Sequence, residues 1–339
     1  MRRFALIVVA LLAATCAAGS AQPASPSVLV FTKTEGYRHE SIPAAIQAVR
    51  TLGAKNGFVV TATEDATVFS AAGLRPYDVV VFLLTTGDVL NASQQAAFEA
   101  YIRAGHGYVG VHSAADTERG WPWYGRLVGA WSSGHPEIQS AVLQVVNPTD
   151  ASTAGLPPRW PRTDEWYSFL TNPRANGVRV LLTLDESTYV PGGWAMGTDH
   201  PIAWKHEFEG GRAWYTQGGH TTESYSEPLF LGHVLGGIQY ALARPKAVAP
   251  KLRALSLTTN GGRVVVRALY DGRCMRCRAT LRVHSRTTAL RLRWSQQRGT
   301  ATGLSAVLPA GRWLATVTLV DPATNASRKV SRWVRVPKI

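Results

Sequence analysis

Short apolar runs alternate with helix-like segments in the first part of the chain. The apolar runs have no polar alternation and are bounded by glycine-rich or polar loops, as expected for strands buried on both faces. They occupy residues 28–31, 58–63, 77–84 and 108–111. Between them, apolar side chains recur at helical spacing around 42–49 and 98–102. Strands separated by helices predict βαβ units and a parallel sheet with helices on both faces.

After residue 120 the pattern is less regular. Residues 178–184, 201–206 and 211–216 resemble strands, and residues 228–242 form a long apolar segment with helical spacing. The following stretch, ARPKAVAPK, is rich in proline and small residues. We therefore predict that an α/β domain spans residues 22–245 and that a linker occupies 246–251.

The last part of the chain has a different pattern and a different charge. Residues 252–339 contain short alternating runs separated by turn signals, which predicts a small antiparallel β-sandwich of immunoglobulin-like type. Residues 251–339 contain 18 Lys and Arg but 2 Asp and Glu. Residues 1–250 contain 18 Lys and Arg and 20 Asp and Glu. Such asymmetry predicts an anionic partner for residues 252–339, for example an envelope polymer. The alternative is a solvated arginine-rich surface without a specific partner.

The N-terminus has the features of a secretion signal. Arg2 and Arg3 precede an apolar segment at 4–14 that is too short to span a bilayer, and small residues follow at 19–21. We predict a signal peptide at 1–21 and a secreted or extracytoplasmic protein, with lipidation at Cys16 as the alternative. No later run reaches the length of a transmembrane helix, and export makes nucleic acid an unexpected partner.

Removal of the signal leaves Cys274 and Cys277 as the cysteines of the chain. Two cysteines at this spacing in an exported protein predict a local disulfide. A zinc site is the alternative, but the pair has only His284 as a nearby third ligand.

The stretch GYVGVHSAADT, residues 107–117, carries the most specific chemical signal. An apolar strand ends abruptly at His112, a pattern that resembles the strand-to-helix elbow of class I glutamine amidotransferases. Those enzymes need a cysteine thiolate at the elbow, and residues 28–250 contain no cysteine. The sequence therefore excludes amidotransferase chemistry. Ser113 is an unsuitable replacement because its surroundings do not match the G-x-S-x-G register.

Several further motifs occur in a consistent order. They are GYRHESI at 36–42, GVHSAADT at 110–117, WYGRLVGA with GHPE at 123–137, DEWY at 164–167 and HPIAWKHEFEGGRAWYTQGGH at 200–220. With the closing helix they resemble the trehalose-utilisation (ThuA-like) family over residues 28–242. The resemblance implies a flavodoxin-like, class I glutamine amidotransferase-like fold and a role in carbohydrate metabolism, without defining the reaction.

Histidines in these motifs are the main candidates for chemistry. Imidazole can act as an acid, a base or a metal ligand near neutral pH. We expect a divalent metal, with zinc the first choice, to be held by His39, His112, His135 and His220. The expected catalytic groups are His112, His220, Glu165 and Asp116. For each residue a structural role remains the alternative: a buried satisfied histidine, a solvated acid, or a helix cap at Asp116.

Aromatic and polar neighbours of these groups are candidates for substrate binding. We expect His39, Ser113, Trp121, Trp123 and Tyr167 to contact a sugar, because flat aromatic faces suit sugar rings. Aromatic neighbours also lead us to expect a raised pKa for Glu165. The predicted function is acid/base chemistry, metal-assisted or not, on a glycoside or keto-sugar by a hydrolase, lyase or isomerase. The alternative is a non-catalytic carbohydrate-binding or cell-envelope-associated protein.

Overall fold

The computed structural model describes most of the chain after the N-terminal segment. The described residues are 25–243, 251–260, 263–271, 278–283, 286–295, 298–305, 307–320 and 327–337. The predicted signal peptide at 1–21, Cys16, and the cysteine pair Cys274 and Cys277 lie outside them. Most of the predicted linker also lies outside, and these predictions stay untested.

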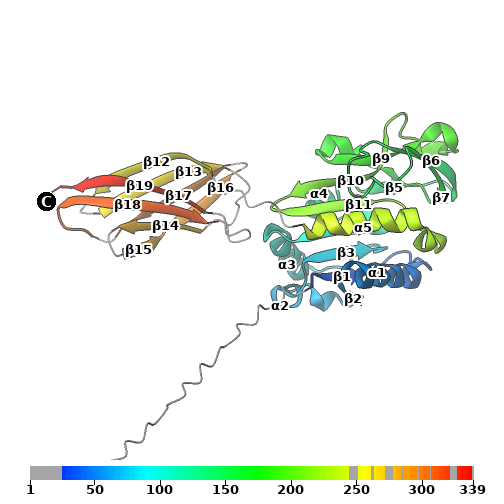
Figure 1. Ribbon diagram of the computed structural model, residues 1–339, viewed down its shortest axis with the longest axis horizontal. Helices are drawn as coiled ribbons and strands as arrows, with labels where there is room; N and C mark the ends of the chain where they lie inside the picture. Colours follow the sequence, from blue (N-terminus) through cyan, green and yellow to red (C-terminus); the bar gives the residue numbers. More distant parts are fainter. Residues whose placement is uncertain are drawn as a thin grey trace, which may run out of the picture.

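A nine-stranded sheet forms the centre of the α/β domain (Figure 1). The first five strands in spatial order are mutually parallel. They are β2 (Val59–Thr63), β1 (Ser27–Phe31), β3 (Val79–Leu83), β4 (Gly107–Val111) and β11 (Gly211–Thr216). Four antiparallel strands extend this core: β10 (His200–Phe208), β9 (Arg179–Asp185), β6 (Gln139–Val145) and β7 (Arg159–Asp164). The predicted parallel sheet is confirmed, and the antiparallel extension occupies the region where the sequence pattern is irregular.

Helices cover both faces of the sheet, as predicted. Apolar side chains of α1 (Ile42–Asn56) and α5 (Pro228–Leu242) pack in one core, on one face. Those of α2 (Ala71–Leu74), α3 (Ala92–Arg103) and α4 (Pro122–Val128) pack in a second core, on the other face. The local sequence explains the helix ends: Asn91 and Gln94 form a capping box before α3, and Gly57 ends α1 in a left-handed conformation.

Short elements complete the α/β domain. A two-stranded sheet pairs β5 (Ser132–Gly134) with β8 (Ser168–Phe169). The 3₁₀ helices are η1 (Ala66–Val68), η2 (His112–Asp116), η3 (Pro173–Asn176), η4 (Glu186–Thr188), η5 (Gly192–Trp194) and η6 (Glu223–Ser226). No helix in the described ranges is both long and apolar enough to cross a membrane.

Strand direction determines which loops meet at one edge of the large sheet. Strands β1, β3, β4 and β11 run in the same direction. Strand β9 regains that direction after two antiparallel steps through β10, and β7 regains it after two more through β6. The segments that follow β1, β4, β7, β9 and β11 therefore leave the sheet at the same edge, where ligands of open α/β sheets bind.

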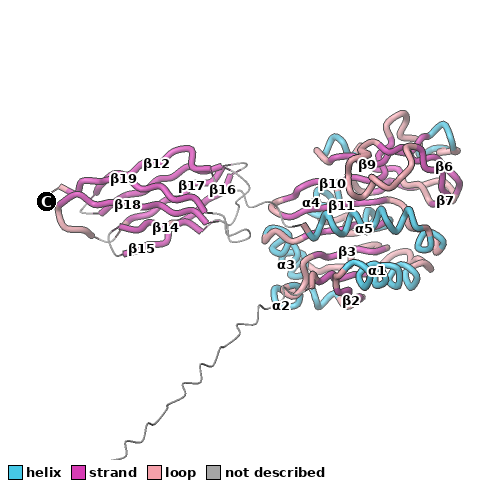
Figure 2. The backbone as a smooth tube through the Cα atoms, viewed as in Figure 1, coloured by secondary structure: helices cyan, strands magenta, loops and turns pink. Residues whose placement is uncertain are grey.

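The C-terminal part contains strands alone among its described elements (Figure 2). One sheet has the order β12 (Lys251–Asn260), β13 (Arg263–Asp271), β17 (Arg298–Leu304), β16 (Arg291–Ser295). The other has the order β15 (Arg286–Ala289), β14 (Arg278–Val283), β18 (Gly311–Val320), β19 (Ser327–Val336). Alternate residues of both sheets, including Val266, Leu281 and Val317, form one apolar core. The predicted antiparallel sandwich is confirmed.

A buried histidine in α5 makes the stability of the protein depend on pH. His233 is fully buried between the carbonyl of Ser152 and the hydroxyl of Thr216, and burial lowers its pKa to about 4. In the unfolded chain His233 takes up a proton near pH 6.5, whereas in the folded protein it stays neutral down to about pH 4. Neutral His233 therefore contributes its full stabilisation above pH 6.5, and this stabilisation falls as the pH decreases toward 4. We expect a loss of up to about 3 kcal/mol across this window. The variant His233→Gln should flatten part of the slope in urea unfolding measured at several pH values.

Candidate functional site

His112 occupies an elbow at the end of β4. Its backbone φ of 54° lies in the left-handed region, which residues other than glycine rarely adopt. The preceding strand is fully buried, and η2 begins at His112 itself. A strained non-glycine residue between a buried strand and a helical turn is characteristic of functional positions. The elbow that the sequence predicted at this position is therefore present, with an imidazole on it.

Four side chains from distant segments bring their donor atoms together beside this elbow. His39 follows β1, His112 follows β4, Glu165 follows β7 and His220 follows β11, and their potential ligand atoms all lie within 4.8 Å of one another. Glu165 Oε2 lies 3.2 Å from His112 Nε2 and 3.2 Å from His220 Nδ1. His112 Nε2 and His220 Nδ1 are also 3.2 Å apart. We call these four residues the His₃Glu cluster.

The tautomer of His112 follows from its second nitrogen. His112 Nδ1 lies 2.7 Å from the backbone carbonyl oxygen of Gln217, which can only accept a hydrogen bond. Nδ1 therefore carries the proton, and in the neutral ring Nε2 presents its lone pair to the cluster. A backbone carbonyl that accepts from the outer nitrogen is the usual arrangement behind a metal-binding histidine.

His39 is buried, and its Nδ1 has no hydrogen-bond partner. Its ring lies edge-on to those of His112 and His220, with centroids 4.8 and 5.0 Å away. Burial, reinforced by the neighbouring histidines, lowers the pKa of His39 to about 3. The ring is therefore neutral at physiological pH, as a metal ligand must be.

Glu165 is ionised, which corrects the expectation of a raised pKa. Burial alone would raise its pKa, but His112 and His220 outweigh burial and hold the pKa below its usual value. The reciprocal effect occurs at His220, where contact with Glu165 outweighs burial and raises the pKa. The cluster thus holds one buried carboxylate in contact with two imidazoles.

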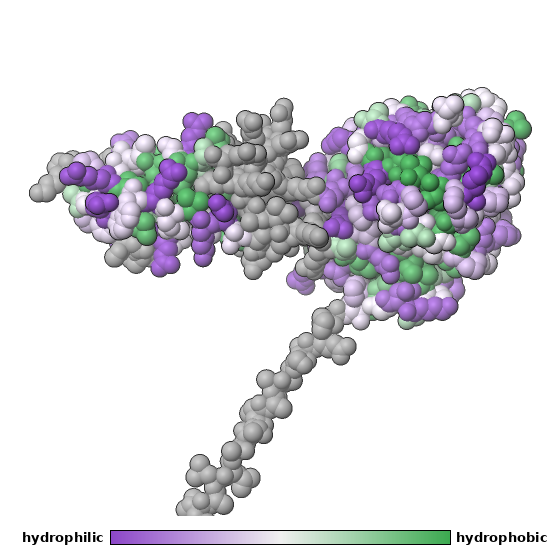
Figure 3. All heavy atoms as spheres, turned by 45° about the horizontal axis from the view of Figure 1, so that its top comes forward, coloured by the Kyte–Doolittle hydropathy of each residue, from purple (hydrophilic) through white to green (hydrophobic). Residues whose placement is uncertain are grey.

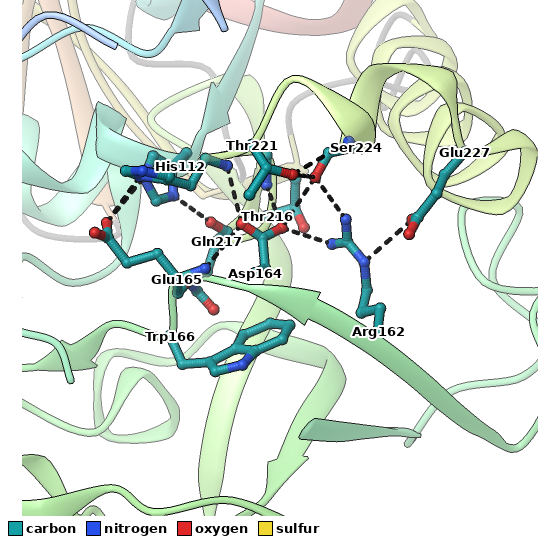
Figure 4. A network of polar contacts seen from close by, with 12 residues as sticks. His112, Arg162, Asp164, Glu165, Trp166, Thr216, Gln217, Thr221, Ser224 and Glu227 are labelled. Carbon is teal, nitrogen blue, oxygen red and sulfur yellow. Dashed lines mark hydrogen bonds and ion pairs between the residues drawn. The ribbon is translucent and has the colours of Figure 1, made fainter. Parts of the chain in front are cut away.

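Asp164, next to Glu165, organises the loop that carries His220 (Figure 4). Its carboxylate accepts hydrogen bonds from the backbone N–H groups of Gly219 and His220 at 2.8 and 3.0 Å. It is fully buried and forms an ion pair of 3.0 Å with Arg162. Asp164 and Gln217 were not predicted as site residues, because no sequence motif marks a residue that acts through hydrogen bonds with or from the backbone.

Two further predicted residues border the cluster. His135 is 42% exposed and its Nδ1 lies 3.2 Å from Glu165 Oε1, the carboxylate oxygen that faces away from His112 and His220. It therefore stands beside the His₃Glu cluster instead of within it. The hydroxyl of Tyr167 lies 3.1 Å from His112 Nε2, and burial keeps the pKa of this phenol well above its usual value.

Other predicted site residues lie elsewhere. Trp121 and Trp123 are core residues, stacked on each other, and their indole N–H groups donate to Glu99 and Glu209. Both are buried against the helices of one face, so the prediction that they contact a sugar is wrong.

Two polar predictions also fall outside the cluster. Asp116 is half-exposed and pairs with Arg119 at 2.6 Å. Ser113 is fully buried, and its hydroxyl has no hydrogen-bond partner among the described residues. Neither side chain belongs to the group of converging donor atoms.

Two exposed aromatic side chains that were not predicted lie beside His39 and beside the residue before His135. Tyr37 is 63% exposed, and its ring stands edge-on to His39 with centroids 4.8 Å apart. Trp194, in the segment after β9, is 41% exposed. Its indole lies so close to Gly134 that a Cβ atom added to this glycine would come within 2.4 Å of the ring. Gly134 precedes His135 in the chain, so Trp194 packs against the segment that carries His135.

Comparisons with known proteins agree with this architecture. A family model for ThuA, described as trehalose utilisation, matches residues 27–241. No curated protein matches the chain significantly. A ThuA-like protein from Bacteroides uniformis has 22% identity over 67% of this chain and 96% of its own, with a TM-score of 0.58. A ThuA-like protein from Parabacteroides merdae has 20% identity over 66% of this chain and 93% of its own, with a TM-score of 0.53.

At 22% and 20% identity, the similarity to these two structures shows that the fold is shared and shows nothing about function. The family match covers almost the whole α/β domain, including every residue of the His₃Glu cluster. The chain therefore belongs to the ThuA family, which is associated with trehalose utilisation.

Proposed function

We propose that the α/β domain is a metal-dependent enzyme that carries out acid/base chemistry on a glycoside or keto-sugar. The convergence of three imidazoles and one carboxylate at the ligand-binding edge of the sheet is the observation that carries this proposal. Random packing rarely leaves buried donor atoms aimed at a common point, because each unpaired buried polar atom costs free energy. A bound cation would satisfy them all.

The donor set and its spacing fit zinc. Imidazole nitrogens and a carboxylate oxygen are zinc ligands, and metal–ligand bonds of 2.0–2.1 Å in a tetrahedron separate the ligand atoms by about 3.3 Å. The separations among His112 Nε2, His220 Nδ1 and Glu165 Oε2 are each 3.2 Å, and the donor atom of His39 lies within 4.8 Å of these three. Glu165 Oε2 and His39 Nδ1 form no hydrogen bonds in the structure. A divalent ion held here would polarise a carbonyl or hydroxyl oxygen of the substrate.

His135 is the side chain best placed to move a proton. It touches Glu165 through the outer carboxylate oxygen, and it remains accessible to a substrate. Tyr167, kept protonated by burial, can donate a hydrogen bond next to His112. A solvent-accessible imidazole beside a fixed carboxylate has the properties of a general acid or base.

The number of carboxylates in the site favours some sugar reactions over others. Glycosidases that use two carboxyl groups need both beside the scissile bond. In the described site Glu165 is the carboxylate of the cluster, while Asp164 is committed to backbone N–H groups and Arg162. Isomerisation or elimination next to a sugar carbonyl suits this arrangement better than direct hydrolysis by two acids.

Metal analysis together with an activity screen tests the proposal. The purified chain should contain about one zinc ion per protein, and the zinc-loaded protein should act on a disaccharide or its keto form. His135→Ala should keep the zinc and lower turnover by about 100-fold, the usual size of an acid/base contribution. A protein that binds sugar but neither binds zinc nor turns over any substrate would instead support the non-catalytic alternative.

The exposed aromatic residue Trp194 gives a test of sugar binding. We expect Trp194→Ala to weaken substrate binding about 10-fold through the loss of stacking area, with zinc content unchanged. Trp121→Phe is the matched control, since Trp121 lies in the core away from the cluster. Equal losses of affinity in both variants, measured by calorimetry, would contradict a role for Trp194 in binding.

A further inference from the structure

The outer face of one sandwich sheet is a second candidate binding surface. In β18, Ala315, Val317 and Leu319 point into the core, so that Leu314, Thr316 and Thr318 point outward. A hollow of about 600 Å³ opens on this side of the sheet. Its lining includes Thr280, Thr316, Thr318, Arg312, Lys329 and Trp333. We call this surface the β18–β19 face.

The charge of this face has one sign. Strands β14, β15, β18 and β19 contain no Asp or Glu. Arg312 and Arg335 are direct cross-strand neighbours, and both are exposed. Like charges in this position destabilise a sheet unless something neutralises them. No described carboxylate forms an ion pair with either arginine, so an external anion would relieve the repulsion.

The β18–β19 face also carries an exposed tryptophan, Trp333, next to the arginines. Trp333 is 62% exposed, and the guanidinium of Arg312 lies over its ring at 5.4 Å. A cation–π contact of this kind uses no N–H group of the guanidinium, so these groups stay available for a carboxylate. The exposed part of the indole suits the apolar face of a sugar ring. In Figure 3, strongly hydrophilic side chains stand singly among less polar ones on the visible part of the sandwich.

We infer that the β18–β19 face binds an anionic polysaccharide that carries carboxylate groups. Its carboxylates would form ion pairs with Arg312, Arg335 and Lys329. Its sugar rings would stack on Trp333, and its hydroxyls would form hydrogen bonds with the neighbouring threonine hydroxyls. A neutral glycan would leave the paired arginines uncompensated. This inference does not depend on the chemistry of the His₃Glu cluster, and it assigns the expected anionic partner of residues 252–339 to one surface.

Binding of polygalacturonate to the full chain tests the inference. We expect Arg312→Ala/Arg335→Ala to weaken binding at least about 10-fold and to reduce its salt dependence. Trp333→Ala should weaken binding with the salt dependence unchanged. The matched control is Arg267→Ala/Arg291→Ala, which removes the same charge from exposed positions of the other sheet and should change affinity less than about 2-fold.

Three results would overturn the inference. Equal losses in the two double variants would show that net charge, not this face, attracts the polymer. Equal binding of a neutral maltodextrin would remove the need for carboxylates. Tighter binding of single-stranded oligothymidylate than of polygalacturonate, with the same sensitivity to Arg312 and Arg335, would identify a nucleic-acid surface instead. Circular dichroism of each variant ensures that the comparison concerns folded protein.

Discussion

Replacing Glu165 with glutamine is expected to lower the zinc affinity of the protein at least about 100-fold and to abolish turnover. Glutamine keeps the size of the side chain but removes its negative charge. The carboxylate oxygen Oε2 lies 3.2 Å from both His112 Nε2 and His220 Nδ1, so it is the one anionic donor in the His₃Glu cluster. Without that charge, a buried dication has only neutral ligands to replace its hydration shell.

Glu186 provides a matched control for this substitution. It forms a comparable pair with a buried histidine, since Glu186 Oε1 lies 2.8 Å from His200 Nδ1, but it lies outside the cluster. Glu186→Gln should leave zinc stoichiometry and affinity unchanged in competition titrations with a chromogenic chelator. Full zinc affinity in Glu165→Gln, or an equal loss in Glu186→Gln, would contradict the assignment of the metal ligands.

The parallel core and the elbow could be predicted because each depends on a local pattern. Continuous apolar runs identify strands that are buried on both faces, and the abrupt change from Val111 to His112 marks the elbow. Glu165 could be proposed as an acid near the site, but its distance from His112 could not. That distance depends on the four antiparallel pairings that bring the end of β7 back to the ligand-binding edge.

Aromatic residues show why substrate contacts were harder to predict. Trp121 precedes α4 and Trp123 lies in its first turn, and both were expected to contact a sugar, yet they stack on each other in the core. Trp194 lies in an irregular segment with no periodic pattern, and only the fold places it against Gly134. Composition identifies aromatic groups suited to sugars, but the distinction between core and surface requires the tertiary structure.

Asp164→Asn is expected to lower the free energy of unfolding by about 3–5 kcal/mol, the usual loss when one partner of a buried ion pair is removed. Asp164 and the side chain of Arg162 are almost fully buried and pair at 3.0 Å. Neutralising Asp164 leaves the guanidinium with Glu227 at 3.2 Å as its remaining charged partner, and that side chain is 36% exposed. The substitution should also lower zinc affinity, because the N–H groups of Gly219 and His220 lose a charged acceptor.

The double variant Asp164→Asn/Arg162→Met separates these two effects. Removing the unpaired guanidinium should restore much of the stability, since a buried pair replaced by uncharged side chains is often nearly neutral. Zinc affinity should stay low, because the loop that carries His220 still lacks the carboxylate that orders its backbone. Asp199→Asn is the control: Asp199 pairs with Arg174 at the surface, and its loss should cost less than about 1 kcal/mol. If the double variant recovered zinc affinity together with stability, Asp164 would support the fold and have no separate part in positioning His220.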